Sequence, residues 1–180
     1  MMSEKVSEKC NGIRIRRMNE SDPAIFCREE RKQGGDASEE KFWRRIKHQE
    51  AGEAVALVAE FEGEPAGYIN VYWNPKTGAF AGQGIPELVD FAVLEKFRRH
   101  GIGAMLMDAA ENIAAEKSDR VWLGVGLHSG YGSAQRMYIK RGYIPDGSGV
   151  WFRDQVCEPY TDCCNDDDLV FYLIKELSHS

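Results

Sequence analysis

The stretch of sequence that decides the fold of this chain is Phe91-Ala92-Val93-Leu94-Glu95-Lys96-Phe97-Arg98-Arg99-His100-Gly101-Ile102-Gly103-Ala104. It runs from an apolar strand through a short loop and a glycine turn into a helix. The first N–H groups of a helix lack intrahelical partners, and the helix dipole favours an anion beside them. Glycines at 101 and 103 let the backbone approach a ligand without interference from a Cβ atom, and the two arginines before them add positive charge. The stretch therefore predicts a seat for a phosphate or pyrophosphate group.

Three other interpretations of this turn compete with the anion seat. In the first, the glycines serve only to enter the helix. In the second, the turn is a P-loop, which requires the string G-x-x-x-x-G-K-[ST] that this sequence lacks. In the third, it is a dinucleotide fingerprint, which needs a third glycine where Leu106 stands and an acidic residue after the next strand. The two nucleotide motifs therefore fit poorly.

Hydrophobic periodicity outward from this turn predicts alternating strands and helices. Two helical stretches lie within 21–50, broken at Gly34-Gly35, and residues 55–73 form two strands joined by a turn at 62–65. Further strands are predicted at 13–18, 87–94, 121–127, from 143 onward and at 169–174, with helices at 101–117 and 133–141. The order βααβββαβαββ predicts an α/β (α+β) fold, with a mixed sheet and helices on its faces.

A second motif, taken together with the glycine turn, gives the sequence a resemblance to a known family. Arg98-x-x-Gly101-x-Gly103 matches the Q/R-x-x-G-x-G/A signature of the GNAT family of N-acetyltransferases, and Ser133–Tyr143 resembles that family's A-x-x-x-Y-x-K-x-G-F/Y signature. The resemblance is specific over residues 86–143 and agrees in element order over roughly 13–175. It implies the acyl-CoA N-acyltransferase (GNAT) fold, with a mostly antiparallel central sheet flanked by helices. It also implies transfer of an acetyl group from acetyl-CoA to a primary amine.

The resemblance further implies how the chain would hold acetyl-CoA. The backbone of Phe91, Ala92 and Val93 would pair with the pantetheine amides, and the Val93 N–H would polarise the thioester carbonyl. The pyrophosphate would be held by the amides of Arg98, Arg99, His100, Gly101, Ile102, Gly103 and Ala104. Ser133, at the start of the second motif, completes the expected set of donor-binding residues.

The same resemblance implies an acid and a base. Tyr138 matches the tyrosine that protonates the sulfur of coenzyme A, and a phenol with an ordinary pKa near 10 is protonated at neutral pH; a plain core aromatic is the alternative. Glu87 has the spacing of the family's catalytic glutamate, or is a solvent-facing charge at the strand entry. Asp90 would replace it if a bulge shifts the strand, and His128 is a further candidate base. Because none of the cysteines matches a family nucleophile, direct transfer in a ternary complex is expected.

The acceptor side is less determined by the sequence. The region where the amine is expected to bind contains aromatic and acidic residues, which would attract a cationic amine. Alternatively, the aromatic residues belong to the core and the acidic run is a solvated loop. These residues are Trp43, Tyr72, Trp73, Phe80, Trp151, Tyr160 and the run 162–168. A small primary amine is the expected substrate. A protein N-terminus or lysine is the alternative within the enzyme class. An acyl-CoA-binding module without catalysis is the alternative outside it.

Composition limits the remaining possibilities. At 180 residues, we expect a flexible segment at 1–12 and one domain at 13–180. A net charge of −6 and a pI near 5.3 argue against a nucleic-acid partner, and the short apolar runs argue against a membrane partner. Five cysteines without an export signal are expected to be reduced thiols of a cytoplasmic protein, with no metal site. The apolar strand at 169–174 suits either burial in the sheet or a homodimer contact.

Overall fold

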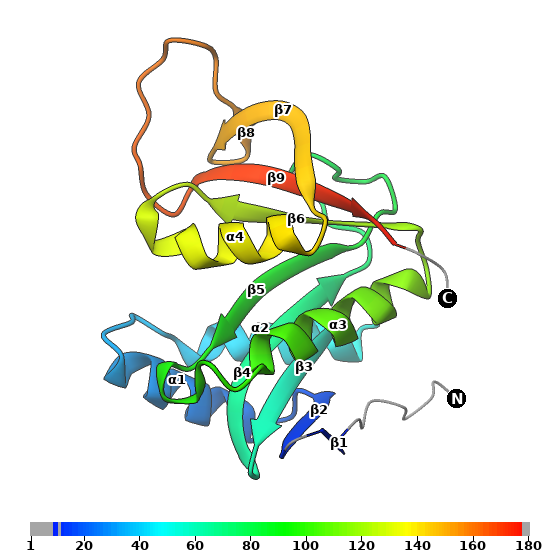
Figure 1. Ribbon diagram of the computed structural model, residues 1–180, viewed down its shortest axis with the longest axis vertical. Coiled ribbons are helices and arrows are strands. Elements are labelled where there is room, and N and C mark those ends of the chain that lie inside the picture. Colours follow the sequence, from blue (N-terminus) through cyan, green and yellow to red (C-terminus); the bar gives the residue numbers. More distant parts are fainter. Residues whose placement is uncertain (1–8, 11, 178–180) are drawn as a thin grey trace. The chain divides into compact units, whose positions relative to one another are not determined.

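The computed structural model describes residues 9–10 and 12–177 (Figure 1). They form two compact units, each assembled from two pieces of chain. The first unit contains the described residues up to Tyr72 together with Val89–Ile113, and the second contains Trp73–Leu88 and the described residues from Ala114 onward. Most of the expected flexible segment 1–12 lies outside the described residues.

The first unit is a set of antiparallel strands covered by helices. Strand β3 pairs on one side with β2 and on the other with β4, and β2 pairs in turn with the short β1. The predicted hairpin between β3 and β4 is present, and it turns at Glu62-Gly63, within the predicted 62–65, because Glu64 and Pro65 already belong to β4. The unit comprises β1 Lys9–Cys10, β2 Ile13–Arg17, α1 Asp22–Lys32, α2 Glu39–Glu50, β3 Ala54–Phe61, β4 Glu64–Tyr72, the later residues of β5 Glu87–Val93, a 3-10 turn at Glu95–Phe97, and α3 Ile102–Ala115 up to Ile113.

An aromatic cluster joins α1 and α2 to the strands of this unit. Phe26 of α1 stacks on Phe42 of α2 at 5.5 Å between ring centroids, and both meet the edge of Tyr68 from β4. All three residues are buried. Their sequence spacing explains the placement, because Phe42 and Ile46 fall on one face of α2 while Ser38 caps its start by accepting a hydrogen bond from the Glu40 N–H.

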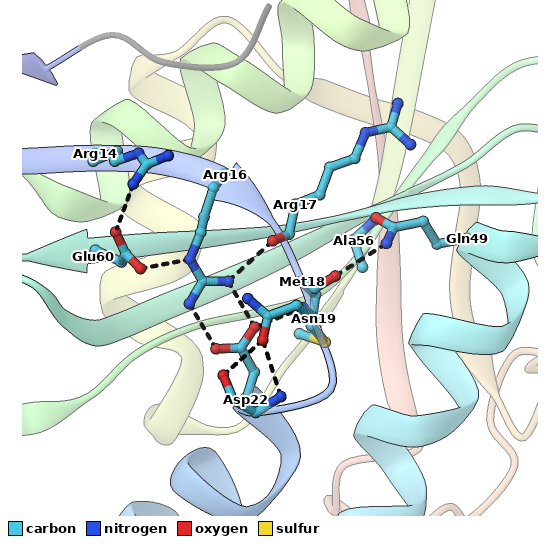
Figure 2. A network of polar contacts seen from close by, with 10 residues as sticks. Arg14, Arg16, Arg17, Met18, Asn19, Asp22, Gln49, Ala56 and Glu60 are labelled. Carbon is cyan, nitrogen blue, oxygen red and sulfur yellow. Dashed lines mark hydrogen bonds and ion pairs between the residues drawn. The ribbon is translucent and has the colours of Figure 1, made fainter. Parts of the chain in front are cut away.

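A buried ion pair fixes the start of α1 against β2 (Figure 2). The Arg16 guanidinium donates to both carboxylate oxygens of Asp22 at 2.7 Å, and its Nε donates to Glu60 of β3 at 2.6 Å. The Asn19 N–H donates to the same Asp22 carboxylate at 2.8 Å. Because Asp22 is fully buried, this arrangement supplies the partners that a buried charge requires.

The second unit combines one parallel and two longer antiparallel strand pairings. Residues Glu87 and Leu88 of β5 run parallel to β6, which is antiparallel to β9, and β9 in turn pairs with β7. Trp122 of β6 is fully buried and packs edge-on against Tyr172 of β9. Trp151 packs edge-on against the same Tyr172 ring. Beyond β5, the unit comprises β6 Arg120–Gly126, a 3-10 turn at Ser129–Tyr131, α4 Gly132–Lys140, β7 Ile144–Phe152, β8 Gln155–Val156 and β9 Leu169–Glu176.

The predicted mixed α/β fold, with mostly antiparallel pairing and flanking helices, is confirmed. The short strands β1 and β8, of two residues each, are additions that the sequence pattern did not predict. Within residues 9–10 and 12–177, no helix has the length and apolar character needed to cross a membrane.

Candidate functional site

The connection from β5 to α3 has the backbone of an anion seat. Gly101 adopts a positive φ of 81°, which glycine accepts without a Cβ clash. The first α-helical bond runs from the Met105 N–H to the Gly101 carbonyl at 3.2 Å, so the N–H groups of residues 102–104 precede it, as an anion seat requires. The Arg98 N–H, which was also expected to hold the pyrophosphate, instead donates to the Glu95 carbonyl at 3.2 Å. Arg98 extends into solvent, paired with Glu95 at 3.3 Å. The structure thus brings the predicted residues 98–104 together in the first unit.

The end of β5 presents two different faces. On one face, an atom at the Cβ position of Gly103 would lie 3.2 Å from the Phe91 ring and 3.7 Å from Val93, so that α3 starts directly against these two side chains. On the other face, Ala92 packs against the core of α1, α2 and β4. The backbone of β5 is tied to β4 by the Leu94 N–H, which donates to the Ala66 carbonyl at 2.9 Å.

Asp90 interrupts the regular strand. Its φ of +60° is in the left-handed region, which turns its carboxylate toward α2. There its two oxygens lie 3.5 Å from Lys41 Nζ and 3.4 Å from Arg45 Nε. Beside it, the Asn70 side-chain amide donates to the carbonyl of Val89 at 3.2 Å.

Two tyrosines of β4 hold the cations that face Asp90. Arg45 donates to the Tyr72 hydroxyl at 2.7 Å, and His48 Nδ1 lies 2.7 Å from the same oxygen. Lys41 donates to the Tyr68 hydroxyl at 2.9 Å, and Tyr68 in turn donates to Glu30 of α1. We call these residues, together with Asp90, the β4–α2 polar cluster. Burial, followed by the nearby charge of Asp90, raises the pKa of Tyr68 above its usual range.

Most residues of the β4–α2 polar cluster were not predicted from the sequence, although a pattern for them exists. On α2, Lys41, Arg45 and His48 follow the i, i+4, i+7 spacing of a single helix face. On β4, alternate residues bring Tyr68, Asn70 and Tyr72 to one face of the strand. Each pattern alone describes an ordinary polar face, so that only the tertiary structure reveals that they meet.

Tyr138 lies in the second unit on α4. Its side chain is buried and meets the ring of Tyr143 edge-on at 5.8 Å. Burial, with a smaller contribution from Tyr131, raises the pKa of Tyr138 to about 12. The phenol is therefore protonated at neutral pH, as a proton donor must be.

Ser133 lies five residues before Tyr138 on the same helix. It lines a hollow of about 370 Å³ together with Met137 and three basic residues, Arg136, Lys140 and Arg141. The positive charge at this hollow suits an anionic group.

Glu87 belongs to the second unit, and Asp90 to the first. Glu87 opens β5 opposite Trp122, is partly buried, and lies close enough to Tyr172 for its charge to contribute to the raised pKa of that phenol. His128, the other candidate base, has both ring nitrogens engaged. Its Nδ1 accepts from the Gly130 N–H at 3.1 Å, so its Nε2 must donate to Asp167 at 2.9 Å. In this arrangement the lone pair on Nδ1 of His128 already accepts a backbone hydrogen bond.

The aromatic residues expected at the acceptor side lie in several different environments. Phe80 and Trp151 pack with Trp122 and Tyr172 in the core of the second unit, and Trp73 lies beneath Lys117 Nζ at 3.8 Å. Tyr72 belongs to the β4–α2 polar cluster, whereas Trp43 and Tyr160 are exposed.

The acidic run 162–168 is mostly exposed and partly paired. Asp167 accepts hydrogen bonds from His128 and from the Tyr131 hydroxyl, and Asp168 lies 3.5 Å from Arg153. Within the part of the chain that the structure describes, no group of three or more His, Cys, Asp or Glu side chains could hold a metal ion.

These features agree with the family to which the sequence is similar. The chain matches the model of the acetyltransferase (GNAT) family over residues 21–143, which is more than half of its length. The chain therefore belongs to the acetyltransferase (GNAT) family, and it is an acyltransferase that uses acetyl-CoA. Among curated proteins, none matches this chain.

Solved structures share its fold at low identity. Ard1 from Thermoplasma volcanium is 21% identical over 93% of this chain and 99% of its own, with a TM-score of 0.67. A ribosomal-protein-alanine N-acetyltransferase from Brucella melitensis is 18% identical over 91% of this chain and 99% of its own, with a TM-score of 0.66. The PaiA N-acetyltransferase from Thermoplasma acidophilum, solved with coenzyme A, is 18% identical over 91% and 98%, with a TM-score of 0.62.

Proposed function

We propose that this chain transfers an acetyl group from acetyl-CoA directly to the primary amine of a small molecule. The observation that carries the proposal is the buried, protonated phenol of Tyr138 on α4, in a chain that also has the glycine turn and helix start at 98–104. A donor seat alone would serve a binding module equally well. A phenol kept neutral by burial supplies the proton that a departing thiolate needs.

In the proposed reaction, Glu87 accepts the proton that the substrate ammonium must lose before its nitrogen can attack. The backbone N–H of Val93 donates to the thioester oxygen while negative charge develops on it. Tyr138 then donates its phenolic proton to the sulfur as the carbon–sulfur bond breaks, and the second proton that the nitrogen loses on becoming an amide restores the phenol. The amide of residue 93 and the helix start would hold the donor, and Ser133 would contact it from α4. Because no cysteine takes part, transfer occurs in a ternary complex.

Two features support a small cationic amine. The loop before β9 combines the exposed ring of Tyr160 with the acidic run 162–168, and both attract positive charge. The chain as a whole has a net charge of −6.

A protein N-terminus is the second candidate, because the similar structures include a ribosomal-protein-alanine N-acetyltransferase. We place the reaction in the cytoplasm, where the free cysteines would remain reduced. We also propose that the chain forms a homodimer through a contact at β9.

Substitution of the two proton-transfer residues tests the mechanism. We expect Tyr138→Phe and Glu87→Gln each to lower kcat by about 100-fold or more, with the Kd for acetyl-CoA within about threefold of the wild-type value. Tyr143→Phe is the matched control, since Tyr143 is equally buried, contacts Tyr138 and should leave kcat within about threefold. Full turnover by Tyr138→Phe would remove this residue from the mechanism.

An acceptor panel tests the substrate class. Wild-type protein would be given acetyl-CoA with diamines, aminoglycoside-like amines, amino acid derivatives and peptides with a free N-terminal alanine, and the acetylated products would be identified by mass spectrometry. We expect the highest kcat/KM for a small cationic amine. A preference for peptides would move the assignment to the protein N-terminus. Binding of acetyl-CoA without turnover of any amine would identify a binding module.

A further inference from the structure

Asp90 of β5 has a left-handed backbone conformation. Asp90 has a φ of +60° in the middle of a strand, although it is not glycine. For an L-residue this conformation is disfavoured by roughly 5- to 30-fold, equivalent to about 1–2 kcal/mol. Such a conformation persists only where the surrounding structure holds it.

Cations of the β4–α2 polar cluster hold the side chain of Asp90 in place. Lys41 and Arg45 each face a different oxygen of the Asp90 carboxylate, at 3.5 and 3.4 Å. These side chains are only 14–27% exposed, so that solvent screens their attraction less than it would at the surface. The two cations are themselves fixed, Lys41 by the Tyr68 hydroxyl and Arg45 by that of Tyr72.

The backbone beside Asp90 is held as well. The Asn70 Nδ2 donates to the Val89 carbonyl at 3.2 Å, which fixes the peptide that leads into Asp90. The Oδ1 of the same fully buried amide finds no hydrogen-bond partner among residues 9–10 and 12–177. The fold thus accepts an unpaired buried acceptor at this position, which is unfavourable by itself.

We propose that Asp90 is a positioning residue, whose carboxylate, held by Lys41 and Arg45, keeps the β5 backbone in the left-handed turn that aims the amides of residues 91–93 at acetyl-CoA. This inference rests on the proposed function of those amides. In this proposal, Asp90 does not act as the general base. An ammonium that approached Asp90 to lose a proton would meet Lys41 and Arg45, and like charges repel.

The test compares three replacements of Asp90 by their affinity for acetyl-CoA, measured by calorimetry on the full chain. Asp90→Ala removes both ion pairs and keeps the Cβ penalty, so its Kd is expected to rise by about 5- to 30-fold. Asp90→Gly removes the ion pairs but adopts a positive φ freely, so its Kd should recover to within about threefold of the wild-type value. Asp90→Asn, which tolerates this conformation better than alanine does, should lie between the two.

A double-mutant cycle tests whether the cations act through Asp90. Arg45→Met should weaken acetyl-CoA binding when Asp90 is present and have no further effect in the Asp90→Gly background. Glu62 provides the matched control, because it also has a positive φ, 52°, but lies in the β3–β4 turn. Glu62→Ala and Glu62→Gly should differ in unfolding free energy and not in Kd.

Two results would overturn the proposal. One is equal affinity for acetyl-CoA in the alanine and glycine variants. The other is a loss of turnover by about 100-fold or more in Asp90→Gly with unchanged affinity, which would make Asp90 the base. Because the Kd series needs no acceptor, it remains decisive even if the wild-type chain acetylates none of the amines tested. Failure of the proposed function would instead appear as wild-type binding without turnover.

Discussion

Replacement of Asp22 by alanine removes the fully buried partner of Arg16. The lost contacts are two hydrogen bonds of 2.7 Å from the guanidinium and one of 2.8 Å from the Asn19 N–H. Arg16, whose side chain is only 14% exposed, keeps the 2.6 Å bond to Glu60. Removal of one partner from a buried ion pair costs about 3–5 kcal/mol, a large part of the ~5–15 kcal/mol that stabilises a typical domain.

Urea unfolding of the full chain, followed by circular dichroism, measures this loss. With an m-value of about 2 kcal/mol/M, the midpoint for Asp22→Ala should fall by roughly 1.5–2.5 M. The exposed pair of Asp119 and Arg120, 3.6 Å apart, provides the control, and Asp119→Ala should cost less than about 1 kcal/mol. Arg16→Met combined with Asp22→Ala should cost less than the two single changes together, because each single change leaves one member of this ion pair without the other and the double variant leaves neither. Equal losses for Asp22→Ala and Asp119→Ala would refute the reasoning.

Two further outcomes are expected. Burial raises the pKa of both Tyr138 and Tyr172 to about 12, so folding favours their neutral form. The stability that this gives is present below the unfolded pKa of about 10 and is lost as the pH rises from about 10 to 12. In an alkaline absorbance titration of the folded chain, these two tyrosines should ionise near pH 12, above the ordinary value of about 10; ionisation of all seven tyrosines near pH 10 in the folded chain would contradict this. Gly103→Val would force methyl groups into Phe91, at a cost of about 1–3 kcal/mol, and should weaken acetyl-CoA binding measured by calorimetry. Unchanged affinity would show that α3 does not need this close approach.

The parts that the sequence predicts correctly are those with local signals. The helix α2 begins beside the capping Ser38, and the hairpin turns at Glu62-Gly63. The entry into α3 follows Gly101 of the motif, whose φ of 81° is one that glycine adopts freely. Each of these structures depends on neighbouring residues, so that spacing and residue type suffice to predict it.

The parts that sequence does not predict depend on contacts between distant segments. The β4–α2 polar cluster draws on α1, α2, β4 and β5, and no single segment contains its pattern. The orientation of Asp90 depends on its left-handed backbone, which an alternating strand pattern cannot reveal. For Phe80 and Trp151 the sequence left two interpretations open, substrate contact or core, because a large ring suits either environment; in the structure they pack with Trp122.

The discontinuous first unit has a consequence for biosynthesis. Its strands β2 to β4 are complete at Tyr72, but β5 and α3, which finish the unit, extend to Ile113. At about 5–20 residues per second, a ribosome needs on the order of several seconds to make the intervening chain. During that interval the β4 edge, which later receives the Leu94 N–H through Ala66, has no partner strand. A nascent chain stalled in this interval should therefore be the form most dependent on chaperones.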